Sequence, residues 1–320
     1  MSRELSVKRI CVFGIGGVGG YFGARIAQTI NEREEKNYES YFIARGAHLD
    51  AIKREGIKVI SPEGTIVGRP TKATDSIEEI PDPDLILLCV KGYDLENTVK
   101  VIAPRINEKT VVIPLLNGAD IYDRIRKNLN SGIVLPACVY VGTHIKGPGV
   151  IQQNGGDGRI LFGKDPKHMA YTPEGVVQIL SDMRINYQWN ENPFAAIWSK
   201  YIFIASFGLV TVYTGMCLGE ILEDETATGR VRDIMQEIYR IAKAKGIDLP
   251  PEIIDKSIDT AAKFPYDTKT SYQRDVEEKG DTNEGDLYGG TIIKEGKIFG
   301  IPTPVTFSVY AGIQEKLKGK

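Results

Sequence analysis

The feature that most constrains this chain is a short apolar run that leads into a glycine-rich turn and then a helical pattern. Val7–Phe13 is strand-like and Gly17–Ile30 has helical spacing. In such a unit the first glycine permits the tight turn, the second lets the backbone approach a pyrophosphate, and the third lets helix and strand pack closely. The motif, spaced Gly-x-Gly-x-x-Gly, therefore predicts dinucleotide binding at Gly14, Ile15, Gly16, Gly17, Val18 and Gly19.

The remainder of the first half alternates apolar runs with helical segments. Runs that are apolar throughout are typical of parallel strands covered on both faces. A cluster of glycines between residues 142 and 158 predicts a hairpin with its tip near Asp157-Gly158. The other expected strands are Ser40–Ala44, Asp84–Val90, Thr110–Leu115, Ile133–Val141 and Ile185–Trp189, with a helix at Pro173–Met183.

The pattern changes after about Asn192, where strand signals stop and long helices follow. We expect an α/β chain, with an N-terminal Rossmann-type, mostly parallel sheet over residues 1–190 and an all-α C-terminal domain over residues 191–320. A length of 320 residues also favours two domains. The expected helices of the second domain are Phe194 to about Leu218, Asp224–Ala244, Pro250–Lys263, Ser271–Glu278, Asp286–Phe299 and Thr303–Leu317.

Composition argues against several other classes of protein. The formal net charge is -2 and the pI about 6.1, so no basic excess predicts nucleic-acid binding. The polar start of the chain lacks the pattern of a signal peptide, and four cysteines without a Cys-x-x-Cys pair fit a reducing cytoplasm. The uncharged run Tyr201–Gly219 is expected to be a buried core helix, not a membrane span. The three histidines are scattered, so no metal site is expected.

The residues after the second expected strand indicate which dinucleotide binds. A unit that binds NAD carries an acid there for the ribose 2′-hydroxyl, whereas this chain has Arg45. A guanidinium can meet a 2′-phosphate with two hydrogen bonds, so we expect NADPH. Lys91 and Asn117 follow the third and fourth runs, and ligands bind at the carboxyl ends of such strands. Both are therefore candidate cofactor contacts, and solvated loop positions are the alternative.

Taken together, these motifs resemble those of the ketopantoate reductase (2-dehydropantoate 2-reductase) family, within the 6-phosphogluconate dehydrogenase-like superfamily. The resemblance covers nearly the whole chain. The segments that carry it are Gly14–Gly19, Ala44-Arg45-Gly46, Val90-Lys91-Gly92, Asn117-Gly118, Gly147-Pro148-Gly149, Ile197-Trp198-Ser199-Lys200, Thr270-Ser271-Tyr272-Gln273-Arg274-Asp275, Asn283-Glu284 and Gly300-Ile301-Pro302-Thr303-Pro304.

The resemblance implies NADPH-dependent reduction of 2-dehydropantoate (ketopantoate) to pantoate, a step of pantothenate and coenzyme A synthesis. Lys200 would be the general acid as hydride reaches C2, because an ammonium stabilises the charge that builds on the ketone oxygen. Glu284 would bind the far hydroxyl of the substrate or orient the lysine. Ser271 would hold the substrate carboxylate, and Asn117 would lie near the substrate. The protein would act as a monomer or homodimer on a small 2-keto acid.

The chain departs from the family pattern on the helix of Lys200. The family has asparagines four and eight residues after its lysine, where this chain has Ile204 and Gly208. These positions share the lysine's face of the helix and are substrate-binding candidates, so we expect a more apolar and roomier site. Another 2-keto acid or an imine is therefore an alternative substrate. A non-catalytic NADPH-binding regulator is a further alternative.

Overall fold

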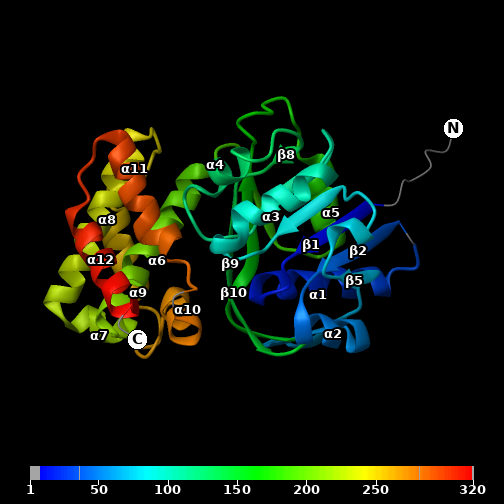
Figure 1. Cartoon of the computed structure of the whole chain (residues 1–320), viewed down its shortest axis with the longest axis horizontal. Helices are drawn as coiled ribbons and strands as arrows, with labels where there is room; N and C mark the ends of the chain where they lie inside the picture. The colour runs from blue at the N-terminus through cyan, green and yellow to red at the C-terminus, as the bar shows by residue number, and fades with distance from the viewer. Residues whose placement is uncertain (1–7, 36, 281, 319–320) are drawn as a thin grey trace. The chain divides into compact units, whose positions relative to one another are not determined.

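The computed structural model describes residues 8–35, 37–280 and 282–318, which form two compact units. The first contains the described residues up to Leu116 and then Ile121–Pro193, and the second contains Asn117–Asp120 and the described residues from Phe194 onward. Strands occur in the first unit, and the described elements of the second are all helices (Figure 1). The predicted fold class is confirmed, although residues 117–120 group with the helical unit.

A six-stranded sheet forms the centre of the first unit, in the order β5-β2-β1-β6-β7-β8, and all its pairs are parallel. Its central strands are buried along most of their length, which is why they read as apolar runs. The strands are β1 (Lys8–Phe13), β2 (Tyr38–Ile43), β5 (Lys72–Thr74), β6 (Leu85–Leu88), β7 (Val111–Pro114) and β8 (Ile133–Val134). The helices of this unit are α1 (Gly17–Glu32), α2 (Gly46–Glu55), α3 (Leu95–Ile102), α4 (Ile121–Arg126) and α5 (Glu174–Asp182), with 3-10 turns η1 (Ile77–Glu79), η2 (Gly92–Asp94) and η3 (Ala103–Arg105).

A second sheet has the order β11-β10-β3-β4, with β9 antiparallel to β10. Helix α1 packs against strands of both sheets. The approach is close at Gly20, where a Cβ would lie 2.5 Å from the Ile151 side chain. The strands are β3 (Ile57–Ser61), β4 (Gly64–Gly68), β9 (Ala137–Gly147), β10 (Val150–Gly163) and β11 (Tyr187–Asn190).

Two expectations about strands are wrong. The β9–β10 hairpin turns at Pro148-Gly149, where Gly149 has a φ of +72°, and not at Asp157-Gly158. The latter pair lies inside β10, where the pairing register shifts between Gly155 and Arg159, as in a β-bulge. The single strand expected over Ile133–Val141 is divided into β8 and β9 around a proline, which has no N–H for a sheet ladder. The β3–β4 hairpin and β5 were not predicted.

The second unit is built around α6, a long apolar helix that packs against α8, α10 and α12. Its length and composition would suit a membrane span, but most of its apolar side chains are buried in this core. It ends at Thr214 and not near Leu218, because Gly215 adopts a φ of +84° that an α-helix cannot contain. The helices are α6 (Phe194–Thr214), α7 (Leu218–Glu223), α8 (Glu225–Ala244), α9 (Ile253–Ala261), α10 (Ser271–Lys279), α11 (Thr291–Phe299) and α12 (Pro304–Lys318), with a π-helical turn η4 (Asp286–Gly290).

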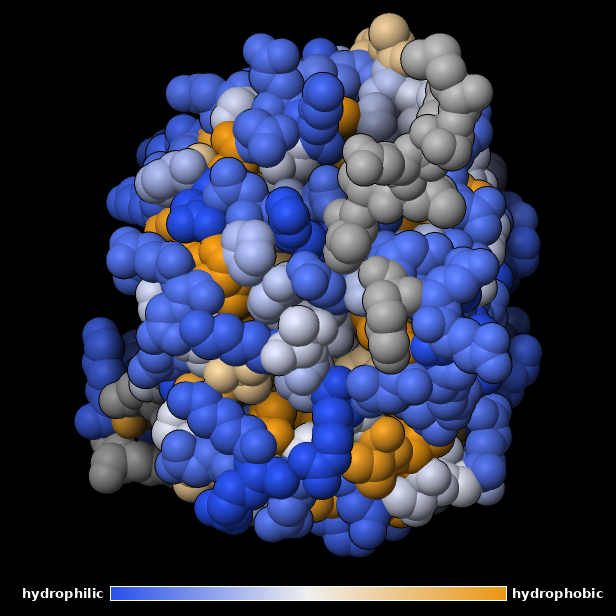
Figure 2. Space-filling model, turned by 90° about the vertical axis from the view of Figure 1, so that its right-hand side faces the viewer, coloured by the Kyte–Doolittle hydropathy of each residue, from blue (hydrophilic) through white to orange (hydrophobic). Residues whose placement is uncertain are grey.

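The large apolar side chains gather mainly in two clusters, one in each unit. The face shown in Figure 2 is mostly hydrophilic, and its hydrophobic residues form small separate groups. Scattered apolar residues of this kind are normal on a solvated surface.

Candidate active site

The glycine-rich turn between β1 and α1 has the geometry of a phosphate cradle. Gly14 has a φ of +92°, and a Cβ on Gly19 would lie 2.0 Å from the Gly14 carbonyl oxygen. A Cβ on Gly16 would meet nothing within 4 Å, so the backbone there faces open space. No side chain caps the start of α1, and its first turn has no acidic residue. The positive end of the helix can therefore accept a pyrophosphate.

His48, on α2, is hydrogen-bonded to the turn of the β9–β10 hairpin, a contact that the sequence did not predict. Its Nδ1 accepts a hydrogen bond from the backbone N–H of Gly149, at 3.0 Å. Burial lowers the pKa of His48 below the usual 6.5, and an interaction with the Ile15 backbone only partly offsets this. The imidazole is therefore neutral at neutral pH, as an accepting Nδ1 requires.

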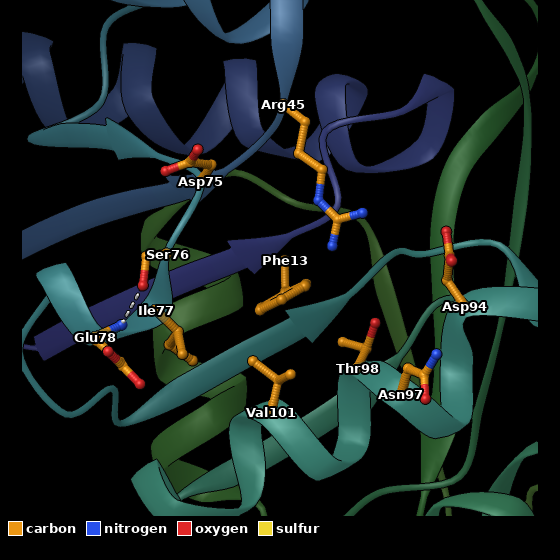
Figure 3. A pocket seen from close by; sticks show the side chains of 10 residues that line it. All are labelled: Phe13, Arg45, Asp75, Ser76, Ile77, Glu78, Asp94, Asn97, Thr98 and Val101. Atoms are coloured by element: carbon orange, nitrogen blue, oxygen red, sulfur yellow. Dashed lines mark hydrogen bonds between the residues drawn. The ribbon is translucent and has the colours of Figure 1, made fainter.

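Arg45 extends into a pocket of about 300 Å³ beside the end of β1 (Figure 3). Its exposed side chain makes no hydrogen bond or ion pair with any described residue. Asp75 also lines the pocket, near the start of a turn closed by a 3.2 Å hydrogen bond from the Glu78 N–H to the Ser76 hydroxyl. The other lining residues are Phe13, Ile77, Asp94, Asn97, Thr98 and Val101. A cation with no partner among the described residues, in such a pocket, suits an anionic ligand.

Lys91 immediately precedes η2, after the end of β6, and its side chain is half-buried. It therefore lies at the carboxyl end of the parallel sheet, as expected.

Six of the predicted site residues belong to the second unit: Asn117, Lys200, Ile204, Gly208, Ser271 and Glu284. The Lys200 ammonium donates a 2.7 Å hydrogen bond to Asn117 Oδ1, although the two residues are 83 positions apart in sequence. The segment of Asn117 is attached to α11 through Asp120, which accepts a 3.3 Å hydrogen bond from the Thr291 hydroxyl. Asn117, which was expected to contact cofactor and substrate, thus contacts Lys200, the expected catalytic residue.

Tyr288, which the sequence did not single out, joins these residues. It lies in η4 with no exposed surface, and Ser271, Asn117 and Glu284 are near enough to influence the pKa of its hydroxyl. Burial raises the pKa of the Tyr288 phenol, and the nearby Glu284 carboxylate raises it further, outweighing the opposite effect of Ser271 and Asn117. The phenol is therefore neutral. The sequence gives no sign that this tyrosine lies beside the candidate site. Its π-helical turn, seen only in the structure, is of a kind that is frequent at functional sites.

Ser271 occupies the first turn of α10, a position suited to binding an anion. The side chain of Thr270 caps this helix by accepting the Gln273 N–H at 3.2 Å. The Thr270 hydroxyl also contacts that of Thr211 on α6, at 2.9 Å. The first turn of α10 has no acidic side chain, so its positive end favours a carboxylate.

Ile204 and Gly208 lie one and two turns beyond Lys200 on α6. Ile204 is half-buried, whereas Gly208 is buried under the ring of Tyr272, which a Cβ at Gly208 would meet at 3.6 Å. The roomier site expected from Gly208 is therefore corrected, because an aromatic ring lines that space. The apolar character expected from Ile204 agrees with its packing against the core of the second unit.

Comparisons with known proteins cover both units. Residues 10–167 match the family described as ketopantoate reductase PanE/ApbA, and residues 193–317 match the C-terminal part of that family. The uncharacterized oxidoreductase YkpB of Bacillus subtilis is 26% identical over 306 residues, which are 96% of this chain and 98% of that protein. The 2-dehydropantoate 2-reductase of Streptococcus pyogenes serotype M1 is 26% identical over 305 residues, 92% of this chain and 93% of that protein.

A solved structure of similar sequence has the same fold. The 2-dehydropantoate 2-reductase from Porphyromonas gingivalis W83 is 27% identical and has a TM-score of 0.81. The match covers 96% of this chain and 99% of that one. The similarity therefore extends over nearly the full length of this chain and of each relative.

Proposed function

The chain belongs to the ketopantoate reductase family, and we propose that it reduces 2-dehydropantoate to pantoate with NADPH as the hydride source. The family and its named relatives make the chain an oxidoreductase acting on a small keto acid. The observation that carries the finer proposal is the Lys200–Asn117 hydrogen bond, within a cluster that also holds Ser271 and Glu284.

The first unit fits a phosphorylated dinucleotide. The open space at Gly16 and the uncapped start of α1 suit the pyrophosphate. The guanidinium of Arg45, which has no hydrogen bond or ion pair within the described part of the chain, suits the 2′-phosphate that distinguishes NADPH from NADH. When bound, the reduced nicotinamide supplies the hydride for the reaction.

Lys200 would supply the proton. As hydride adds to C2 of the keto acid, the C=O π electrons move onto oxygen, and the ammonium both stabilises this charge and gives up one proton to it. The product is a 2-hydroxy acid, and Lys200 is left neutral until it takes a proton from solvent. Asn117 Oδ1 would help to orient the ammonium, because a hydrogen bond restricts the rotation of a flexible lysine side chain.

Two further residues would bind the two ends of the substrate. Ser271, in the first turn of α10, which has no acidic residue, would bind the carboxylate. Glu284 is buried next to Tyr288 and would accept the terminal hydroxyl of 2-dehydropantoate. Asn117, which is hydrogen-bonded to Lys200, would lie beside the substrate.

A second candidate is an apolar 2-keto acid, favoured by a particular feature of α6. Ile204 and Gly208 replace the family's two asparagines, and the ring of Tyr272 lies over Gly208. Each missing hydrogen bond would cost about 0.5–1.5 kcal/mol of binding to a polar substrate. The reaction and the catalytic residues would be the same for either acid.

The variant Lys200→Ala tests the proposal. Oxidation of NADPH with 2-dehydropantoate should slow by about 10²–10⁴-fold, the usual contribution of a general acid. NADPH binding, followed by its fluorescence, should be nearly unchanged, because the residues proposed to bind its pyrophosphate and its 2′-phosphate are on the first unit. Lys297→Ala, which removes an exposed lysine of α11, is the control. Turnover by Lys200→Ala near that of the wild type would show that another group gives the proton.

A further inference from the structure

Asp75 lies beside the end of β2, although it follows a different strand. It comes directly after β5, which pairs in parallel with β2. The register sets Ile43 opposite Thr74, and the Ala44 N–H donates a 2.9 Å hydrogen bond to the Thr74 carbonyl oxygen. Because the carboxyl ends of parallel strands meet at one edge of the sheet, Asp75 lies at the edge where a unit that binds NAD has its acid.

The turn that carries Asp75 is fixed on both sides. The Ser76 N–H donates to the Thr74 hydroxyl at 3.3 Å, and the Glu78 N–H donates to the Ser76 hydroxyl at 3.2 Å. Asp75 itself is exposed, and its side chain makes no hydrogen bond or ion pair with any residue that the structure describes. The backbone therefore holds this carboxylate at the pocket, where it is available to a ligand.

Arg45 and Asp75 line the same pocket without forming an ion pair. Figure 3 shows the Arg45 side chain extending toward the middle of the pocket, with Asp75 to one side. Within the described part of the chain, neither side chain is bound to the other or to a further residue. The pocket thus offers a ligand both a cation and an anionic acceptor of hydrogen bonds.

The balance of charge in this pocket is negative. Its lining includes three carboxylates and one guanidinium, those of Asp75, Glu78, Asp94 and Arg45. A 2′-phosphate would add about 1.5–2 further negative charges, so the carboxylates reduce the advantage that Arg45 gives to NADPH. The uncharged 2′-hydroxyl of NADH meets no such repulsion.

We propose that Asp75 is a second determinant of cofactor specificity, which accepts a hydrogen bond from the ribose 2′-hydroxyl of NADH. The chain then uses NADH as well as NADPH, because Asp75 binds the hydroxyl of one and Arg45 the phosphate of the other. The inference rests on the proposed function, since it places the adenosine ribose of the cofactor in this pocket. Both contacts are charge-assisted hydrogen bonds, so the Kd for NADH should lie within about tenfold of that for NADPH.

Titration of the protein with NADH and with NADPH, followed by the fluorescence of each nicotinamide, tests this role. Asp75→Ala should raise the Kd for NADH by about tenfold to a hundredfold, the range for a hydrogen bond to a charged group. The Kd for NADPH should fall by about threefold to tenfold, because the variant removes a repulsion of the 2′-phosphate. A residue that only supported the fold would, when replaced, weaken the binding of both cofactors.

Asp50→Ala is the matched control. It removes an exposed carboxylate from α2, the helix that begins after Arg45, and Asp50 does not line the pocket. Both Kd values should stay as in the wild type. The inference would be overturned if the two Kd values changed in the same direction in Asp75→Ala, if neither changed, or if Asp50→Ala had the same effects.

These titrations contain no keto acid, so they separate the inference from the proposed function. A wild type that binds both cofactors but reduces no 2-dehydropantoate would contradict only the proposed function. A wild type that reduces 2-dehydropantoate with NADPH, yet binds NADH more than about tenfold less tightly than NADPH, would overturn only the inference. Binding of neither cofactor would overturn both.

Discussion

Arg45 is the residue on which the proposed cofactor preference depends. We expect Arg45→Ala to lower the NADPH-to-NADH ratio of kcat/KM by about tenfold to a hundredfold, because a hydrogen bond to a charged group contributes about 1.5–3 kcal/mol. Asp75 remains in the same pocket and would disfavour a 2′-phosphate further. Arg54→Ala, in the last turn of α2, is the control. An unchanged ratio in Arg45→Ala would remove this residue from the cofactor site.

Site residues could be predicted from the sequence where a polar side chain adjoins an apolar run. Arg45, Asn117 and Lys200 stand at the ends of strands or beside a long apolar run, and the structure shows Lys200 bound to Asn117. Tyr288 could not be predicted in this way. It lies near residues that are distant in sequence, and a tyrosine in a buried turn has the pattern of a core residue.

Substituting alanine for Gly19 and for Gly208 should change the stability of the protein in opposite directions. A Cβ at Gly19 would lie 2.0 Å from a backbone oxygen, so Gly19→Ala must move the phosphate turn and should cost about 1–3 kcal/mol of stability along with NADPH affinity. A Cβ at Gly208 would meet Tyr272 at an ordinary 3.6 Å inside α6. Gly208→Ala should therefore stabilise the protein by about 0.5–1 kcal/mol through its higher helix propensity.

Urea unfolding of the two alanine variants, with cofactor titration, measures both effects. Destabilisation of Gly208→Ala as large as that of Gly19→Ala would contradict the packing described around α6.

The elements themselves were predicted best where one physical signal dominated. The buried strands of the parallel sheet and the long helices of the second unit follow from their apolar periodicity. The hairpin tip was misplaced because Gly149 and Gly158 both have positive φ, and only the pairing of β9 with β10 shows which glycine makes the turn. The short strands β3, β4 and β5 carry too few apolar residues for their periodicity to be recognised.

The residues of the proposed function are divided between the two units. The first carries the glycine turn and Arg45, and the second carries Lys200 with Asn117, Ser271 and Glu284. The fold class could be predicted because the change from strands to helices occurs once along the chain. The transfer of residues 117–120 to the helical unit could not, since a short loop after β7 gives no sign of which core it joins.

The central claim is that these units together reduce 2-dehydropantoate. The most direct test compares kcat/KM for 2-dehydropantoate and for an apolar 2-keto acid such as 2-ketoisocaproate, each with NADPH. Because Glu284 can accept the terminal hydroxyl that only the first acid has, we predict a higher kcat/KM for 2-dehydropantoate. A clear preference for 2-ketoisocaproate, or no reaction with either acid, would contradict the account.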